Sequence, residues 1–418
     1  MKVRKRFWLL LFVVIIGIGF FFLPKLTNAK DSLEDIISSI RVYIEALYYV
    51  RNAYIEKNLD NKKLEYESIK GMVKALDDPY TEFFDPKSFK TFTEDMQGAF
   101  GGIGIRIESR DGKILVVSPI ENTPAYKAGI KAGDEIVEVD GQSVVGKPLD
   151  VVVSLIRGEV GKEVKIKIYR DSDKKYYEYT LKREIIEVPV VDYKTLKNNI
   201  GYIKFYEFTQ NSPQKMIDAL KKLEKTSGLI LDLRNNPGGD LRSAVMIASI
   251  FISDSDQVKT VIKNGETKTF TTKGVVVYRI DRDKNLYGEK VVKGIYRWNK
   301  PLVVLVNRYS ASASEILSGA LKDYGKGILV GEKTFGKGVV QTIFTLSDGS
   351  ALKITTEKYL LPSGRDINKE GVQPDVVVEM APENVGKDND IQLNKAIEVL
   401  LKQISKLGKT EKLVLNKN

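Results

Sequence analysis

The chain has 418 residues, 43% of them hydrophobic, and it contains no histidine and no cysteine. Composition therefore excludes a Ser-His triad, a cysteine nucleophile, disulfides and any His or Cys metal site, and we expect neither a metal nor a cofactor. The 66 Lys and Arg exceed the 55 Asp and Glu by 11, but these charges are interspersed along the chain, which favours a solvated surface over nucleic-acid binding.

The first 26 residues differ in composition from the rest. Basic residues at positions 2, 4, 5 and 6 precede an apolar segment at 7–23, whose 17 residues are close to the roughly 17 to 25 that cross a bilayer as a helix. We favour an uncleaved membrane anchor, with a cleaved signal peptide as the alternative and Ala29 ending a weak cleavage site. The positive-inside bias predicts that the rest of the chain is extracytoplasmic, either on the cell membrane or secreted.

Residues 31–96 form a predicted N-terminal helical region. The pattern is helical from Asp31 to about Phe84: apolar residues recur at three- and four-residue steps from Ile36 to Tyr48, and a second amphipathic stretch at 64–76 ends at a turn at 77–80. Such faces usually pack within a fold. A face this wide beside a membrane anchor also fits self-association, so a homodimer or higher homo-oligomer is expected.

Residues 97–182 change to short strands separated by turns, which is typical of a small separate domain. A glycine-rich turn at 98–105 opens it, and a strand at 114–117, a small helix at 124–129, a helix at 149–156 and a closing strand at 163–169 follow. Residues 183–380 alternate strands with helices and predict an α/β core. Within this core, 265–299 is expected to form hairpins or a flap, and 381–418 a C-terminal helix, at 390–402, and a tail.

Three segments contain residues with chemical potential. A Gly-Gly pair ends the segment Asp-Leu-Arg-Asn-Asn-Pro-Gly-Gly at 232–239, between a strand and a helix, where it exposes backbone amides or serves only the turn. Ser310, Ser312 and Ser314 stand at a helix start. Either one of them is a nucleophile, or all three, with Glu315, serve only to cap the helix.

The third segment holds Lys337 between two glycines. A lysine acts as a base near neutral pH only if its pKa falls by about three units from roughly 10.4, at a cost of about 4 kcal/mol. Burial of the amine by Phe335, Val339 and Val340 would lower its pKa, and Gln341 would orient it by a hydrogen bond. The alternative is an ordinary solvated surface lysine.

Together these segments resemble the carboxyl-terminal processing proteases, also called tail-specific proteases. The matching motifs are Leu-Asp-Asp-Pro-Tyr at 76–80, the segment 232–239, Ser-Ala-Ser-Ala-Ser-Glu at 310–315, Gly-Glu-Lys-Thr-Phe-Gly-Lys-Gly at 331–338 and Gly-Val-Gln-Pro-Asp at 371–375. The resemblance implies a ClpP/crotonase-like β/α protease core with an inserted PDZ-like domain. It also implies a Ser-Lys dyad of Ser312 and Lys337, 25 residues apart, with Gln341 beside the lysine and the amides of Ala313 and Gly238 as oxyanion donors.

The unit at 97–182 resembles a PDZ domain through Ala-Gly-Asp-Glu-Ile at 132–136 and Val-Asp-Gly at 139–141. The resemblance implies that it binds protein substrates with apolar C-termini by adding the peptide to a strand edge. The expected groove residues are Gly101, Gly102, Ile103, Gly104, Ile105, Val152, Ile156 and Arg157. Arg157 either links the groove to the protease core or is a surface cation at a helix end.

The predicted activity is that of an extracytoplasmic serine endopeptidase acting near substrate C-termini through an acyl-enzyme. The competing interpretation is a catalytically inactive PDZ adaptor or ligand-binding protein on the same core. Two segments depart from the family pattern: 265–299 matches no family motif, and Leu-Leu-Pro at 360–362 replaces a Tyr-x-Thr-Pro-like sequence.

Overall fold

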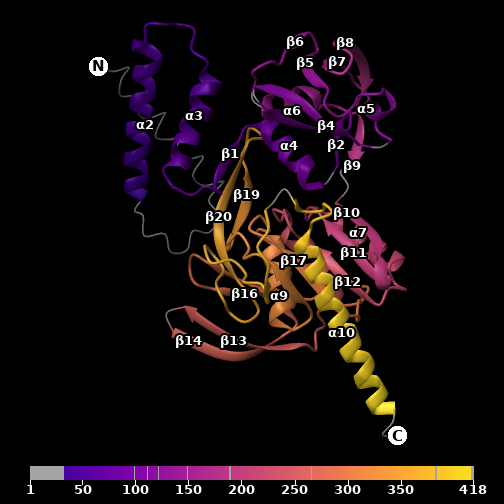
Figure 1. Cartoon of the computed structure of the whole chain (residues 1–418). Helices are drawn as coiled ribbons and strands as arrows, with labels where there is room; N and C mark the ends of the chain where they lie inside the picture. The colour runs from indigo at the N-terminus through magenta and orange to yellow at the C-terminus, as the bar shows by residue number, and fades with distance from the viewer. Residues whose placement is uncertain are drawn as a thin grey trace. The chain divides into compact units, whose positions relative to one another are not determined.

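The computed structural model describes residues 33–415 except 98, 111, 121, 148, 188, 189, 265, 382 and 383 (Figure 1). The predicted anchor at 1–26 lies outside these residues. The chain divides into two compact units, one ending at Ile69 and the other beginning at Lys70. Over the described ranges, no helix combines the length and the apolar character that a membrane crossing needs.

The N-terminal region is helical, as its periodicity predicts. It contains α2 (Leu33–Ala53) and α3 (Asn61–Lys74). Many large apolar side chains of α2 are exposed, including Val42 and Tyr48. The expected self-association remains a prediction.

The helical pattern ends earlier than the sequence predicts. Residues 82–84 form a strand, β1 (Glu82–Phe84), which pairs antiparallel with β20 (Ala351–Leu360) in the register Glu82↔Lys353 and Phe84↔Ala351. Phe83 and Phe84 are buried by this pairing, so tertiary contacts override the helical periodicity. The helix α4 (Pro86–Gln97) follows.

The PDZ-like region is a sheet in the order β3-β4-β5-β7-β8, with β6 beside β5, packed on a short helix. Its elements are β3 (Ile105–Arg110), β4 (Lys113–Pro119), α5 (Pro124–Lys127), β5 (Glu135–Val139), β6 (Gln142–Ser143), α6 (Leu149–Ile156), β7 (Glu163–Arg170) and β8 (Lys175–Lys182). The strand at 163–170 therefore does not close the domain, because β8 pairs with it along its whole length.

The opening glycines also differ from the prediction of a free turn. Residues 99–102 form β2 (Ala99–Gly102), which pairs with β9 (Glu184–Glu187) in the register Gly101↔Ile185 and Gly102↔Glu184. A Cβ on Gly101 would lie 2.0 Å from the oxygen of Gly158, so glycine is needed there for close backbone approach.

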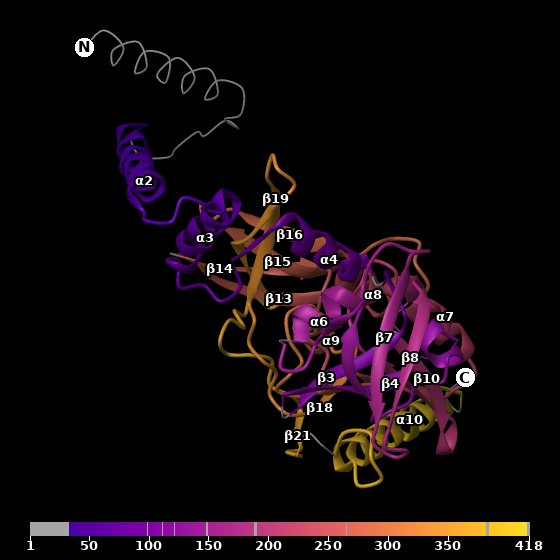
Figure 2. The ribbon, with the colours of Figure 1, turned by 90° about the horizontal axis from the view of Figure 1, so that it is seen from above.

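The core of the second unit is a sheet in the order β10-β11-β12-β17-β18-β21, parallel except for β10. Its strands are β10 (Val191–Leu196), β11 (Ile200–Phe205), β12 (Gly228–Asp232), β17 (Leu302–Val306), β18 (Ile328–Gly331) and β21 (Val376–Val377), with a 3-10 turn η1 (Lys197–Asn199). Helices cover both faces, as a buried parallel sheet requires. The helices α7 (Ser212–Lys222), α8 (Leu241–Phe251) and α9 (Ala313–Asp323) lie on one face, and α10 (Ile391–Leu415) lies on the other (Figures 1 and 2).

A second sheet of the core has the order β1-β20-β15-β16, with β19 (Val339–Thr345) also paired to β20 (Figure 1). The segment 265–299 contributes β15 (Val275–Asp281) and β16 (Leu286–Lys290) to this sheet. Hairpins are present, as predicted: β14 (Glu266–Lys273) pairs with β13 (Gln257–Asn264) outside the two core sheets, and β15 pairs antiparallel with β16. Val276 and Val277 are fully buried, so β15 is part of the core rather than a flap.

Candidate functional site

The three clustered serines have different surroundings where β17 leads into α9. Ser310 is fully buried and its hydroxyl donates to the carbonyl of Leu233 at 2.8 Å. Ser314 is also fully buried, and its hydroxyl donates to the carbonyl of Asn236 at 3.0 Å. Ser312 is half-buried, and its hydroxyl donates no hydrogen bond to the part of the chain that the structure describes. Ser312 is therefore the serine of this cluster with an available hydroxyl proton.

The backbone of Ser312 is strained. Its φ of 55° and ψ of −116° lie in a region that residues other than glycine rarely occupy, at the N-cap of α9. A sharp turn from a strand to a helix is also how α/β hydrolases expose their nucleophilic serine. The turn is held by Asn236, whose carbonyl accepts from the amide of Ala311 at 3.1 Å and from Ser314.

Gly238 lies against this turn. A Cβ on Gly238 would be 2.8 Å from Cβ of Ser312 and 2.9 Å from the amide nitrogen of Ala313, at a φ of 102°. The structure thus brings together Gly238, Ser312 and Ala313, as the sequence predicts. The Gly238 amide, however, donates to Oδ1 of Asn236 at 2.9 Å, so in this geometry it is not a free oxyanion donor. Within the described residues, the amides of Ala313 and Gly239 donate no hydrogen bond.

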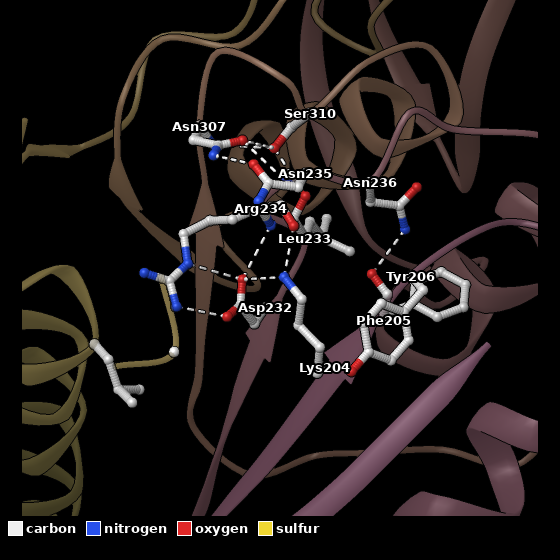
Figure 3. Close-up of polar contacts among 12 residues, drawn as sticks. Lys204, Phe205, Tyr206, Asp232, Leu233, Arg234, Asn235, Asn236, Asn307 and Ser310 are labelled. Carbon is white, nitrogen blue, oxygen red and sulfur yellow. Dashed lines mark hydrogen bonds and ion pairs between the residues drawn. The ribbon is translucent and has the colours of Figure 1, made fainter. Parts of the chain in front are cut away.

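A buried ionic network supports the 232–239 turn (Figure 3). Arg234 donates to both carboxylate oxygens of Asp232, at 3.0 and 2.6 Å, and pairs with Asp390 at 2.7 and 2.9 Å. Lys204 donates to the carbonyl of Arg234 at 2.5 Å and to Asp232 at 3.3 Å. Burial alone would raise the pKa of Asp232, but Lys204, Arg234 and Tyr202 hold it below its ordinary value.

Figure 3 also shows how Ser310 serves this turn. The Asn307 side chain accepts from the amide of Asn235 at 2.9 Å and donates to its side-chain oxygen at 2.7 Å. The amide of Asn307 donates to the Ser310 hydroxyl at 3.0 Å. Ser310 therefore joins the ends of β12 and β17, a structural role.

Glu315 joins the predicted nucleophile to the predicted base. One oxygen of its fully buried carboxylate accepts from the amides of Ser312 and Lys337, both at 2.9 Å, and the other accepts from the hydroxyl of Thr334 at 2.5 Å and the amide of Gly336 at 2.7 Å. Burial raises the pKa of this carboxyl, while its four donors act in the opposite direction. Sequence reasoning assigned Glu315 only to helix capping. Capping is part of its role, since it completes a capping box with Ser312.

Tyr359 makes a second connection between the same two residues. Its buried hydroxyl is within hydrogen-bonding distance of the carbonyl of Lys337 and of the carbonyl of Ser312, the latter at 3.3 Å. The backbones of Ser312 and Lys337 are thus tied by a carboxylate on their amides and by a hydroxyl near their carbonyls. Nothing in the sequence pattern indicated this role for Tyr359.

The Lys337 amine lies over the ring of Tyr80, 4.7 Å from its centroid. Burial lowers the pKa of Lys337 and nearby Lys353 adds to this effect, whereas Asp78 and Glu315 oppose it. Within the described residues the amine makes no hydrogen bond to Ser312 Oγ. Phe335, which was expected to help bury the Lys337 amine, is itself 54% exposed, and the ring beside the amine is that of Tyr80.

Gln341 lies at a β-bulge. The β19–β20 register shifts between Val340, opposite Glu357, and Gln341, opposite Thr355. Its side-chain amide donates to the Thr355 hydroxyl at 3.2 Å. Bulges re-aim side chains and occur often beside active sites, which is consistent with a positioned amide.

Peptide binding at the expected groove remains a prediction, and the expected residues differ in their surroundings. Strand β3, which begins at Ile105, is at one end of its sheet, so a backbone edge is present. Val152 and Ile156 are buried in the domain core rather than exposed in a groove, because α6 turns them toward the sheet. Ile103 is buried with them.

Arg157 and Gly104 have local partners in this domain. The Arg157 guanidinium stacks over Phe100 at 3.9 Å. Gly104, with a φ of 76°, is packed so closely on Thr123 that a Cβ would lie 2.3 Å from it. Sequence reasoning missed Arg183, which donates to the carbonyls of Leu155 and Ile156 at 3.0 and 2.8 Å and so caps α6.

Family models match two parts of the chain: Peptidase family S41 matches residues 199–378 and the PDZ domain matches residues 101–181. The chain is 38% identical over 359 residues to the carboxy-terminal processing protease CtpA of Bacillus subtilis strain 168, covering 85% of this chain and 71% of that protein. It is 41% identical over 337 residues to a probable CtpA-like serine protease of Staphylococcus haemolyticus strain JCSC1435, covering 80% of this chain and 64% of that protein.

Two solved structures are also similar. The photosystem II D1 C-terminal processing protease is 31% identical, with 84% of this chain and 95% of that chain covered and a TM-score of 0.47. A putative S41 protease from Bacteroides fragilis NCTC 9343 is 14% identical, with 91% and 99% covered and a TM-score of 0.50, which indicates a shared fold.

Proposed function

The chain belongs to the carboxyl-terminal processing proteases of peptidase family S41, and on that premise we propose that it is a serine endopeptidase with a Ser312–Lys337 dyad. Its substrates are proteins cleaved near apolar C-termini that the PDZ domain binds. The observation that carries the proposal is the difference among the serines: Ser310 and Ser314 donate their hydroxyl protons to backbone carbonyls, and Ser312 does not.

The proposed reaction begins with a neutral Lys337. Its amine takes the proton of Ser312 Oγ as that oxygen attacks the scissile carbonyl carbon, and the resulting ammonium gives the proton to the leaving amine. Water then hydrolyses the acyl-enzyme. The burial that lowers the pKa of Lys337 supports this role, because a lysine with its ordinary pKa is protonated near neutral pH.

The oxyanion of the tetrahedral intermediate would be held first by the amide of Ala313, at the N-terminus of α9. For the Gly238 amide to hold the oxyanion as well, it must first break its hydrogen bond to the Asn236 side chain. Gly239, whose amide is not used by the described residues, is the alternative second donor. Gln341, held by Thr355, would orient the amine by a neutral hydrogen bond.

The remaining features are extensions of the proposal. The core is of the ClpP/crotonase-like type, the N-terminal segment anchors the chain in the cell membrane with an extracytoplasmic catalytic part, and the protein self-associates through its helical region. The competing class is an inactive PDZ adaptor. The exposed α2 side chains support self-association, and the intact Ser312, Lys337 and Gln341 set favours the enzyme.

The test compares the wild-type chain with Ser310→Ala, Ser312→Ala and Ser314→Ala, using an unstructured protein that ends in apolar residues. We expect Ser312→Ala and Lys337→Met to lose cleavage at a temperature where thermal unfolding shows that both are folded, although Ser312→Ala also loses an N-cap hydroxyl. Ser310→Ala and Ser314→Ala should lower stability and retain cleavage at a temperature where they are folded. Cleavage by Ser312→Ala at the wild-type rate would refute the dyad, and binding without cleavage by wild type would favour the adaptor.

A further inference from the structure

The turn at residues 78–81 meets the proposed base and its glutamine, although it lies far from both in the sequence. It precedes β1, whose pairing with β20 places it beside the loop that holds Lys337. We infer that this turn is a positioning element, in which the Tyr80 ring holds the resting amine of Lys337 and Thr81 holds the support of Gln341. The inference rests on the proposed function of Lys337.

The first contact is between an aromatic face and an amine. Tyr80 is half-buried, and the nitrogen of Lys337 lies 4.7 Å from its ring centroid. An ammonium is attracted to an aromatic face, more strongly where water is partly excluded. Because the amine makes no hydrogen bond to Ser312 Oγ within the described residues, the position over Tyr80 is a resting position. The amine must move closer to the serine hydroxyl to accept its proton.

Other charged groups face the same amine from three elements. Lys353 approaches from β20, Asp78 from the turn itself and Glu315 from α9. Lys353 is paired with Glu82 at 2.8 Å, and Glu315 is engaged by four donors. Removing the Tyr80 ring leaves all of them in place, so a change in the titration of Lys337 then reports the ring.

The second contact is a chain of hydrogen bonds that ends at Gln341. The Thr81 hydroxyl donates to Asp78 at 2.6 Å and accepts from the amide of Thr355 at 3.0 Å. The Thr355 hydroxyl accepts from the Gln341 amide at 3.2 Å. Thr355 lies at the bulge, where the ladder alone does not define its position. Thr81 therefore fixes the residue on which Gln341 rests.

The test measures the pH dependence of labelling of the full chain by a fluorophosphonate, which reacts with an activated serine and needs no known substrate. Labelling should slow at low pH, where Lys337 becomes protonated, and we call this part of the pH profile the acid limb. Tyr80→Leu removes the ring that favours the ammonium, so the acid limb should move to lower pH by about 0.5 to 1 unit. Tyr80→Phe keeps the face and should leave the limb unchanged. Tyr80→Trp offers a stronger face and should move it to higher pH.

Tyr193, a 48% exposed tyrosine on β10, gives the matched control Tyr193→Leu, which should leave the limb unchanged. Thr81→Val should lower the labelling rate at the plateau about tenfold, and Thr81→Ser, which keeps the hydroxyl, should restore it. If the acid limb is unshifted in both Tyr80→Leu and Tyr80→Trp, or if Thr81→Val and wild type are labelled at equal plateau rates, the inference about the turn is wrong while the proposed function stands. Equal labelling of wild type and Ser312→Ala would instead overturn the proposed function.

Discussion

Replacing Glu315 by glutamine tests whether the buried carboxylate organises the site. Its two oxygens accept four hydrogen bonds, from the amides of Ser312, Lys337 and Gly336 and the hydroxyl of Thr334. An amide has one accepting oxygen, so in either orientation at least one backbone N–H faces an NH2 group. A hydrogen bond to a charged group contributes about 1.5 to 3 kcal/mol, and an unsatisfied buried donor costs about 1 to 3 kcal/mol. We expect Glu315→Gln to lower the free energy of unfolding by about 2 to 4 kcal/mol.

The loss of activity should exceed what the loss of stability explains. The amides that Glu315 holds belong to the proposed nucleophile and base, and a misplacement of about 1 Å costs on the order of 100-fold in rate. We expect kcat to fall by about that factor, with KM nearly unchanged, in a peptide-cleavage assay at a temperature where the variant is folded.

Glu332 provides the matched control for this experiment. It is a buried carboxylate in the segment 331–338 that also holds Lys337, and it accepts from the amide of Met380 and pairs with Arg308. Glu332→Gln should lower stability without a comparable fall in kcat. If Glu315→Gln retains wild-type kcat and unfolding midpoint, or Glu332→Gln lowers kcat as much, the assigned role of Glu315 is wrong.

Three further predictions concern the turn at 232–239. Arg234→Met should destabilise the chain by about 3 to 5 kcal/mol in urea unfolding, because two buried carboxylates lose their partner; a change below about 1 kcal/mol would contradict this. Burial alone would raise the pKa of Asp390, but Arg234 and two backbone amides hold it below its ordinary value, as Lys204 and Arg234 do for Asp232. Their contribution to stability is therefore complete above about pH 4 and is lost as pH falls below it, so unfolding midpoints that stay constant from about pH 5 to pH 3 would argue against it. Gly238→Ala should abolish cleavage by displacing Ser312, since its Cβ would lie 2.8 Å from Cβ of that residue; wild-type activity would refute the close packing.

The elements that repeat an apolar pattern were predictable from sequence. The helix at 149–156 and the strand that begins at 163 lie where their patterns place them, because local periodicity and turn residues define both. β1 was not predictable in this way. Its three residues lie inside the range assigned to the helical region, after the turn at 77–80, and they form a strand by pairing with β20.

The residues of the proposed site also divide into those that sequence indicated and those that it did not. Composition, with no histidine or cysteine, excluded most nucleophile and base combinations, and the resemblance to the family implied Ser312, Lys337 and Gln341 as the proposed set. No sequence pattern selects Tyr359 as the group beside two backbone carbonyls, or Tyr80 as the ring beneath the lysine.

Sequence by itself thus indicated the family through its motifs and, through that resemblance, the three residues proposed for chemistry, because a motif depends only on residue type and order. Only the tertiary structure decided that Ser310 and Ser314 use their hydroxyl protons, that the Gly238 amide is already engaged and that Glu315 joins Ser312 to Lys337. Those contacts join segments distant in sequence, and they depend on sheet register and on the path of the chain between strands. Neither is encoded in a local pattern of residues.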